Sequence, residues 1–121
     1  MIAPSKINLD KSKTLLTITF DNVDYILSAE YLRVYSPSAE VVGHGPGQET
    51  LQVDKESVSI SGIQPVGNYA VVLLFSDGHD TGIYSWSHLN NLCLNKDKLW
   101  ADYIQRIKLA GHNHSQLNQS L

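Results

Sequence analysis

Five histidines and a single cysteine are the side chains in this sequence that could bind a metal ion through nitrogen or sulfur. They are His44, His79, His88, Cys93, His112 and His114. A structural zinc site needs four ligands, usually supplied as two closely spaced pairs. Here the only close pair is His112 and His114, near the end of the chain. Spacing therefore predicts no metal site, and a metal-binding alternative would depend on His79 and His44, with His88 as a third ligand.

The residues that could act as nucleophiles give no catalytic set. Cys93 lies between two leucines, and an apolar neighbourhood would raise the pKa of its thiol and lower its reactivity. Residues 76–80 place a hydroxyl, two carboxylates and the His79 imidazole close together. The Asp77-Gly78 pair at their centre is typical of a hairpin turn, and neighbours in a turn do not make a catalytic triad. We therefore expect no enzymatic activity and no cofactor.

A glycine-rich stretch at residues 43–48 could bind a phosphate group through successive backbone N–H groups. Its sequence, GHGPGQ, matches neither of the glycine-rich nucleotide-binding patterns, and no lysine lies nearby. Pro46 also removes one of the N–H donors. The stretch is predicted to be a surface loop whose glycines allow a tight path.

The composition of the 121 residues excludes several other functions. Nine Lys and Arg against twelve Asp and Glu give a formal net charge of -3, which argues against nucleic acid or an anionic membrane as the partner. The longest apolar run is far too short to span a bilayer, and the N-terminus lacks the apolar run of a signal peptide. Because a single cysteine cannot form an intrachain disulfide, we expect a soluble, cytoplasmic protein.

Strand and helix signals alternate along the chain. Apolar and β-branched residues predict strands at 7–10, 15–20, 25–27, 57–63, 69–75 and 79–84. Turn residues at 21–24 and 76–79 predict two hairpins. Ser28 is the expected N-cap of a short helix that ends near Val34, and Ser85 or Ser87 is expected to cap a second one.

A last helix is predicted over about residues 97–110. Apolar side chains recur there at helical spacing, and Gly111 ends the pattern. The polar residues 112–121 that follow are predicted to be a flexible tail, which leaves a single domain over residues 1–111.

The order of strand, acidic turn, strand and short helix occurs twice, which suggests an internal duplication of a β-β-α unit. Ile26, Ser28 and Leu32 align with an Ile, a Ser and a Leu placed 57 residues later. Two unrelated hairpin-and-helix units could also look alike by chance, and both explanations stay open. Either way the predicted fold is α+β, with antiparallel hairpins and short helices packed beside them, closed by the C-terminal helix.

Five segments, in order and spread over about residues 14–111, resemble the gamma-butyrobetaine hydroxylase-like N-terminal domain family. They are LRVYSPSAEV at 32–41, GHGPGQ at 43–48, PVGNYAV at 65–71, FSDGHDTGIYSW at 75–86 and LWADY at 99–103. The resemblance covers nearly the whole chain. It implies a family of largely uncharacterised function, of which this chain would be a stand-alone, bacterial-type member.

The resemblance implies that a similar domain occurs in eukaryotic hydroxylases. There it precedes a catalytic dioxygenase domain and binds zinc through three cysteines and a histidine. Carried over residue by residue, the cysteine positions fall on Ser36, Ser38 and Val41, and the histidine position falls on His79. Hydroxyls and a valine cannot replace thiolate ligands. The zinc is therefore expected to be lost. Without a metal, His79→Ala should cost little stability, whereas Trp100→Ala, as a core truncation, should cost about 3–5 kcal/mol.

The resemblance also implies a link to P-loop ATPases that carry iron–sulfur clusters, since domains of this family occur joined to them. We therefore expect a non-enzymatic accessory domain with a protein partner, one that assists iron–sulfur cluster assembly or delivery. The surface expected to contact the partner or a ligand consists of Tyr35, Ser36 and Ser38 with Gly43, His44, Gly45 and Gly47 of the glycine loop.

Overall fold

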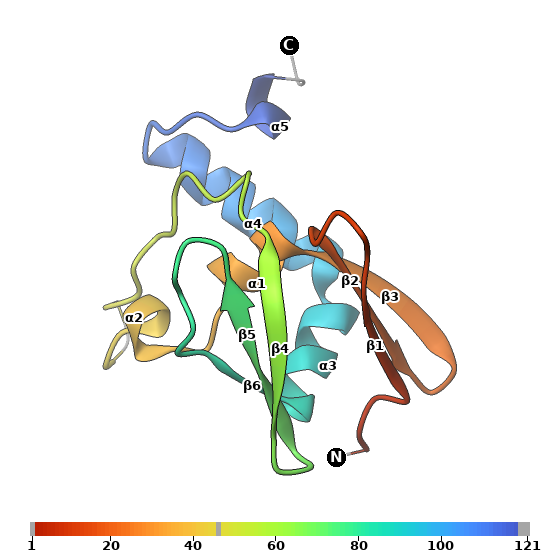
Figure 1. The fold of residues 1–121 in the computed structure, drawn as a ribbon. Helices are drawn as coiled ribbons and strands as arrows, with labels where there is room; N and C mark the ends of the chain where they lie inside the picture. Colours follow the sequence, from red (N-terminus) through yellow and green to blue (C-terminus); the bar gives the residue numbers. More distant parts are fainter. Residues whose placement is uncertain (1, 46, 119–121) are drawn as a thin grey trace.

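The computed structural model describes residues 2–45 and 47–118, which form two three-stranded antiparallel sheets and five helices. The first sheet contains β1 (Lys6–Leu9), β2 (Leu15–Phe20) and β3 (Val23–Ser28), in that spatial order, and leads into α1 (Ala29–Val34). The second contains β4 (Ile60–Val66), β5 (Ala70–Phe75) and β6 (Ile83–Ser85) and leads into α3 (Trp86–Leu94). The remaining helices are α2 (Ala39–Val42), α4 (Lys96–Leu109) and α5 (Ser115–Asn118). The predicted α+β arrangement is confirmed (Figure 1).

The two sheets repeat one unit, three strands followed directly by a helix whose first turn is capped by serine. Ser28 Oγ accepts the backbone N–H of Tyr31 at 3.0 Å, and Ser85 Oγ accepts that of His88 at 3.1 Å. Both caps satisfy an N–H group that the first helical turn leaves without an intrahelical partner. The predicted β-β-α repeat is thus present with one more strand in each copy.

The hairpin turns form where the sequence places residues that tolerate positive φ. Asp21 and Asn22 adopt φ of 49° and 65° between β2 and β3, and Gly78 adopts 88° in the turn after β5. Asp and Asn visit this region more readily than other side chains, and Gly does so without steric cost. The turn residues therefore place the hairpin between β2 and β3 as predicted. After β5 the chain also turns at Gly78, but it pairs with β5 again only from Ile83.

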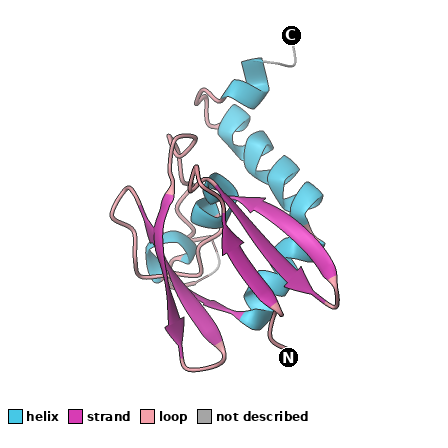
Figure 2. Cartoon of the chain, turned by 45° about the vertical axis from the view of Figure 1, so that its right-hand side comes forward, coloured by secondary structure: helices cyan, strands magenta, loops and turns pink. Residues whose placement is uncertain are grey.

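The inner faces of both sheets and the helices α1 and α3 share one apolar core. Its fully buried members include Leu16, Ile18, Leu27, Leu32, Ile60, Leu73, Leu89 and Leu92. Buried tyrosine hydroxyls tie the elements together within it: Tyr31 donates to the carbonyl of Leu92, and Tyr84 donates to that of Leu32. A buried phenol needs such a partner, because an unpaired polar group in the core is costly. In Figure 2 the strands of the two sheets are magenta, and the long C-terminal helix lies at the upper right and leads toward the C-terminus.

The chain differs from the sequence-based expectation in four places. The strand predicted at 57–63 begins and ends three residues later, as β4 (Ile60–Val66). Residues 36–56, in which the sequence patterns predict neither a strand nor a helix, include the short helix α2. The strand predicted at 79–84 is shorter, since only Ile83–Ser85 pairs with β5. Of the predicted flexible tail, residues 115–118 form α5 and His114 is buried, while residues 119–121 lie outside the described residues. No described helix has both the length and the apolar character needed to cross a membrane.

Candidate functional site

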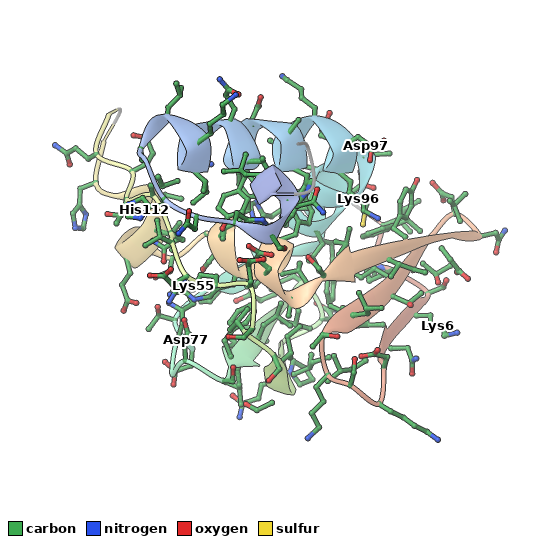
Figure 3. The ribbon with its side chains drawn as sticks, turned by 90° about the horizontal axis from the view of Figure 1, so that it is seen from above. Lys6, Lys55, Asp77, Lys96, Asp97 and His112 are labelled. Atoms are coloured by element: carbon green, nitrogen blue, oxygen red, sulfur yellow. The ribbon has the colours of Figure 1, made fainter. Side chains whose placement is uncertain are left out.

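A buried arginine organises the polar region between α1 and the turn after β5. Arg33 stands in the last turn of α1 and is 7% exposed. Its Nε donates to Asp77 Oδ2 at 2.9 Å, and Lys55 Nζ donates to the same oxygen at 2.7 Å. Figure 3 shows Lys55 and Asp77 next to each other. One carboxylate thus holds two cations from segments that are distant in the sequence.

The charge state of Asp77 follows from these contacts. Burial opposes its ionisation, but the hydrogen bonds from Lys55, from the backbone N–H of His79 and from Arg33 outweigh burial and lower its pKa to about 2. Hydrogen bonds to a carboxylate favour its charged form. Asp77 is therefore ionised at neutral pH.

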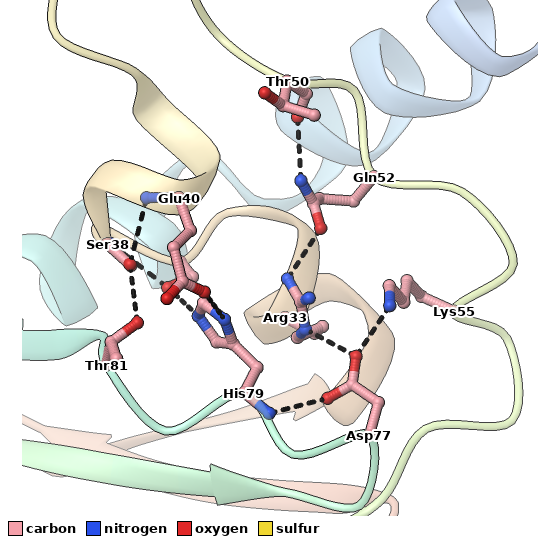
Figure 4. Close-up of polar contacts among 10 residues, drawn as sticks. Arg33, Ser38, Glu40, Thr50, Gln52, Lys55, Asp77, His79 and Thr81 are labelled. Carbon is pink, nitrogen blue, oxygen red and sulfur yellow. Dashed lines mark hydrogen bonds and ion pairs between the residues drawn. The ribbon is translucent and has the colours of Figure 1, made fainter.

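Arg33 also fixes the segment that follows the glycine loop. Its Nη1 donates to Gln52 Oε1 at 2.8 Å, and Gln52 Nε2 donates to the carbonyl of Thr50 at 3.0 Å (Figure 4). Gln52 is itself buried. The hydrogen bonds place residues 50–52 beside α1, although sequence patterning gave this segment no regular structure.

His79 connects two other side chains of the region through both ring nitrogens. Nε2 lies 2.8 Å from Ser36 Oγ, and Nδ1 lies 3.1 Å from Glu40 Oε2 (the contact with Glu40 is drawn in Figure 4). Burial, reinforced by the positive charge of Arg33, lowers the pKa of His79, so the ring is neutral near pH 7. A carboxylate can only accept, so Nδ1 carries the hydrogen and donates to Glu40, while Nε2 accepts from the Ser36 hydroxyl.

The order serine, histidine, carboxylate is that of a hydrolytic triad, but access to the serine is missing. Ser36 is 0% exposed, and its hydroxyl packs against Gly82. A nucleophile must reach a substrate carbonyl, and no carbonyl can approach Ser36 Oγ here. The serine and histidine of this relay are buried and the Glu40 side chain is exposed, and the hydrogen bonds among the three residues fix the segment after α1.

The glycine loop has the tight path that its composition predicts. Gly43 adopts a φ of 76°, and any Cβ at this position would collide with the backbone of Gln48. The N–H of Gln48 donates to the carbonyl of Gly45, and that of Thr50 donates to Val41. His44 is exposed on the loop, and Pro46 lies outside the described residues. The loop returns the chain to α2 and so places Glu49 and Thr50 beside it.

A pocket of about 140 Å³ opens where α1, α2, residues 49–52 and α4 meet. It is lined by Val34, Tyr35, Ser36, Val41, Val42, Glu49, Thr50, Gln52, His88, Tyr103 and Arg106. Two of the residues expected to contact a partner, Tyr35 and Ser36, lie in this lining, and the glycine loop leads directly into it. Ser38 instead donates or accepts a hydrogen bond with Thr81 at 2.7 Å, and is buried.

One wall of the pocket is held rigid by Tyr35. Its hydroxyl donates to the carbonyl of Leu99 at 2.7 Å and accepts from Arg106 Nη2 at 3.3 Å, and the guanidinium of Arg106 lies over the tyrosine ring. The carbonyl of Tyr35 accepts from His88 Nε2 at 2.9 Å. Arg106, Tyr103 and His88 were not expected at the site, because they come from helices more than 50 residues away in the sequence.

Residues 7–90 match the family described as gamma-butyrobetaine hydroxylase-like, N-terminal. The chain belongs to this family. Two NMR solution structures are each 46% identical to it, with TM-scores of 0.82 and 0.78, and cover 93% and 94% of this chain and 90% and 86% of their own. A crystal structure from Acidithiobacillus ferrooxidans, of a protein of unknown function in the DUF971 family, is 38% identical with a TM-score of 0.58, covering 74% of this chain and 90% of that one. A comparison with curated proteins found no match.

The positions that the gamma-butyrobetaine hydroxylase-like family resemblance assigns to zinc do not fit zinc in this chain. Ser36 and His79 are hydrogen-bonded to each other, but Ser38 bonds Thr81 and Val41 is buried and apolar. Neutral hydroxyls with one imidazole lack the thiolate donors of a structural zinc site. Within residues 2–45 and 47–118, no three His, Cys, Asp or Glu side chains are grouped to hold a metal. Both nitrogens of His79 are already engaged, so the geometry adds no support to the alternative with His44.

Cys93, the chain's single thiol, is buried in the core next to α4. Burial raises its pKa to about 11. At neutral pH the side chain is a protonated, small apolar group and not a nucleophile.

Proposed function

We propose that this chain is a non-enzymatic interaction domain that binds a protein partner at the surface around the pocket between α1, α2 and α4. The observation that carries the proposal is the pocket itself. It joins the Tyr35–Ser36 wall to the end of the glycine loop, on a scaffold whose nearest serine–histidine–carboxylate relay is closed to substrates. A rigid, partly apolar hollow suits the anchor of a partner better than a reaction.

The narrower part of the proposal concerns the partner. Because members of this family occur joined to P-loop ATPases that carry iron–sulfur clusters, we propose that the partner is such an ATPase and that the chain assists cluster assembly or delivery in the cytoplasm. With one buried cysteine, the chain would act by contact and would not supply a set of cluster ligands.

A titration followed by NMR tests the proposal. Isotope-labelled protein is mixed with a purified carrier ATPase, with and without nucleotide, while backbone amide resonances are recorded. We expect the resonances of residues 35–50 to shift, and those of β1, which lies on the first sheet, to stay unchanged. Unmoved resonances across residues 35–50 would contradict the placement of the contact surface.

A further inference from the structure

Beyond the contact surface itself, the dimensions of the pocket indicate what enters it. Its volume is about 140 Å³, close to the roughly 150 Å³ of an apolar cavity that accepts a benzene ring. Sites for whole organic ligands are larger, about 300–1,000 Å³. The space therefore fits a single large apolar side chain, of the kind that anchors a protein interface.

The walls have the chemistry of such an anchor site. Val34 and Val41 are buried, Tyr103 is 1% exposed, and Val42 forms an exposed edge at 45%. The polar members of the lining are largely committed to the protein, since Gln52 bonds Arg33 and His88 bonds the Tyr35 carbonyl. An apolar group would displace water from these walls without leaving a buried donor unpaired.

A second, shallower hollow continues from the first and is acidic. It is lined by Tyr35, Glu49, Leu99, Asp102, Gln105 and Arg106, and shares three of these residues with the pocket. Arg106 is held over Tyr35 by a hydrogen bond and a ring contact. Glu49 and Asp102 have no ion-pair partner within the part of the chain that the structure describes. The two carboxylates are thus unpaired among the described residues, and the cation of the hollow, Arg106, is already held by Tyr35. The hollow therefore favours a basic group of a ligand.

We propose that the pocket and its acidic neighbour bind a partner segment in which a large apolar side chain, such as Phe, stands next to a Lys or Arg. The apolar side chain fills the pocket, and the basic group lies between Glu49 and Asp102. This inference rests on the proposed interaction function and deepens it. The fixed Tyr35 wall and the constrained glycine loop present the site with little conformational entropy to lose on binding.

Capped dipeptides provide the test, with NMR titration of the whole chain as the measurement. We expect Phe-Lys to give saturable shifts at the amides of Tyr35, Thr50 and His88, and Ala-Lys to give none. Phe-Glu should bind about threefold more weakly than Phe-Lys, as for an exposed ion pair. Absence of saturable shifts with millimolar Phe-Lys would overturn the proposal. Equal binding of free toluene and Phe-Lys would also overturn it, in favour of a small-molecule cavity.

Matched variants locate the binding. Val42→Trp places an indole at the exposed edge of the pocket. It should weaken the binding of Phe-Lys at least about tenfold, as the loss of an anchor residue does. Val23→Trp alters a side chain of similar exposure, 49%, on β3 and should change nothing. Glu49→Lys should remove the preference for Phe-Lys over Phe-Glu, whereas Asp80→Lys, with the same change in net charge, should keep it. Unaltered peptide binding by Val42→Trp would refute the assignment.

Repeating the ATPase titration with Val42→Trp separates the two proposals. Undiminished ATPase binding by this variant would leave the interaction function in place and refute the anchor. If the peptides bind as expected and the wild-type chain does not bind the ATPase, the proposed anchor pocket is supported and the proposed ATPase partner is refuted.

Discussion

Asp77 is the residue at which charge and fold are most directly coupled. Its carboxylate accepts hydrogen bonds from Lys55, Arg33 and the backbone N–H of His79. Its pKa of about 2 therefore lies below the ordinary value of 3.8. Since the folded-state pKa is the lower one, the stabilisation is complete above about pH 4 and is lost as the pH falls from about 4 to 2. Asp77 is partly exposed, so solvent screening reduces the effect, and we expect a loss of about 1 kcal/mol in the free energy of unfolding over that range.

Denaturant unfolding at several pH values measures this loss. Asp77→Asn should be less stable at neutral pH and should lose less between about pH 4 and 2 than the wild-type chain does. Asp80→Asn is the control, because Asp80 is a neighbouring exposed carboxylate without a partner among the described residues. Its stability should depend on pH as that of the wild type does. If Asp77→Asn and wild type show the same acid dependence, the ion pairs do not stabilise the fold.

His79 leads to a second prediction, which revises the expectation from sequence that its replacement costs little. The side chain is buried and bonded at both nitrogens. We expect His79→Ala to lower the free energy of unfolding by about 1–3 kcal/mol, because the buried Ser36 hydroxyl loses its acceptor. His44→Ala, at an exposed position, is the control and should have no effect.

The pKa of His79 gives this prediction a second measurement. Because the folded-state pKa is lowered, the unfolded chain binds the proton more readily, and stability should fall as the pH drops below about 6.5. The difference between wild type and His79→Ala should therefore shrink on acidification. A difference that stays constant with pH would show that folding leaves the pKa of His79 unchanged, as for a ring exposed to solvent.

At the scale of elements, the parts of the fold that depend on local chemistry could be predicted from sequence. The hairpins follow from Asp, Asn and Gly in turns, and α1 and α3 begin at the predicted serine caps. The parts that depend on pairing across the chain could not. Helix α2 is a single turn, and the pocket forms only because α4 lies beside residues 34–52. Periodicity carries no information about which helix a loop will meet.

The C-terminal segment shows the same limit. Its polar composition predicts a flexible tail, yet His114 is buried and its Nε2 donates to Glu30 Oε2 at 2.7 Å. The direction follows from the N–H of Gln116, which donates to Nδ1 and leaves the ring hydrogen on Nε2. Tyr103 donates to the same oxygen of Glu30. A buried carboxylate on α1 therefore holds residues 114–118 in a defined place, and the sequence around residue 114 does not reveal this partner.

We expect His114→Ala to destabilise the chain by about 1–3 kcal/mol, since among the described residues the buried Glu30 carboxylate would keep only Tyr103 as its donor. His112→Ala alters an exposed neighbour two residues away and should change stability by less than about 0.5 kcal/mol. Chemical denaturation measures both. Equal stabilities of the two variants would mean that residues 112–118 do not pack on α1 in solution.

At the scale of the whole molecule, Trp100 connects the two apolar clusters of the protein. One cluster lies between the sheets and helices α1 and α3, and the other comprises Val34 of α1 with Tyr103 and Ile107 of α4. Trp100 packs against both, with its ring 6.4 Å from that of Tyr31 and 5.3 Å from that of Tyr103. The side of the pocket formed by α4 therefore depends on this contact for its position.

Trp100→Ala should accordingly destabilise the protein and loosen the pocket. The side chain is partly and not fully buried, so we expect a loss of about 2–4 kcal/mol, below the cost of a fully buried tryptophan. Trp86→Ala is the matched control, because Trp86 is also partly buried but packs against the larger cluster alone. The Phe-Lys dipeptide should bind more weakly to Trp100→Ala and normally to Trp86→Ala under conditions in which both variants are folded. If the two variants lose the same stability and bind the peptide equally, α4 is positioned by contacts other than Trp100.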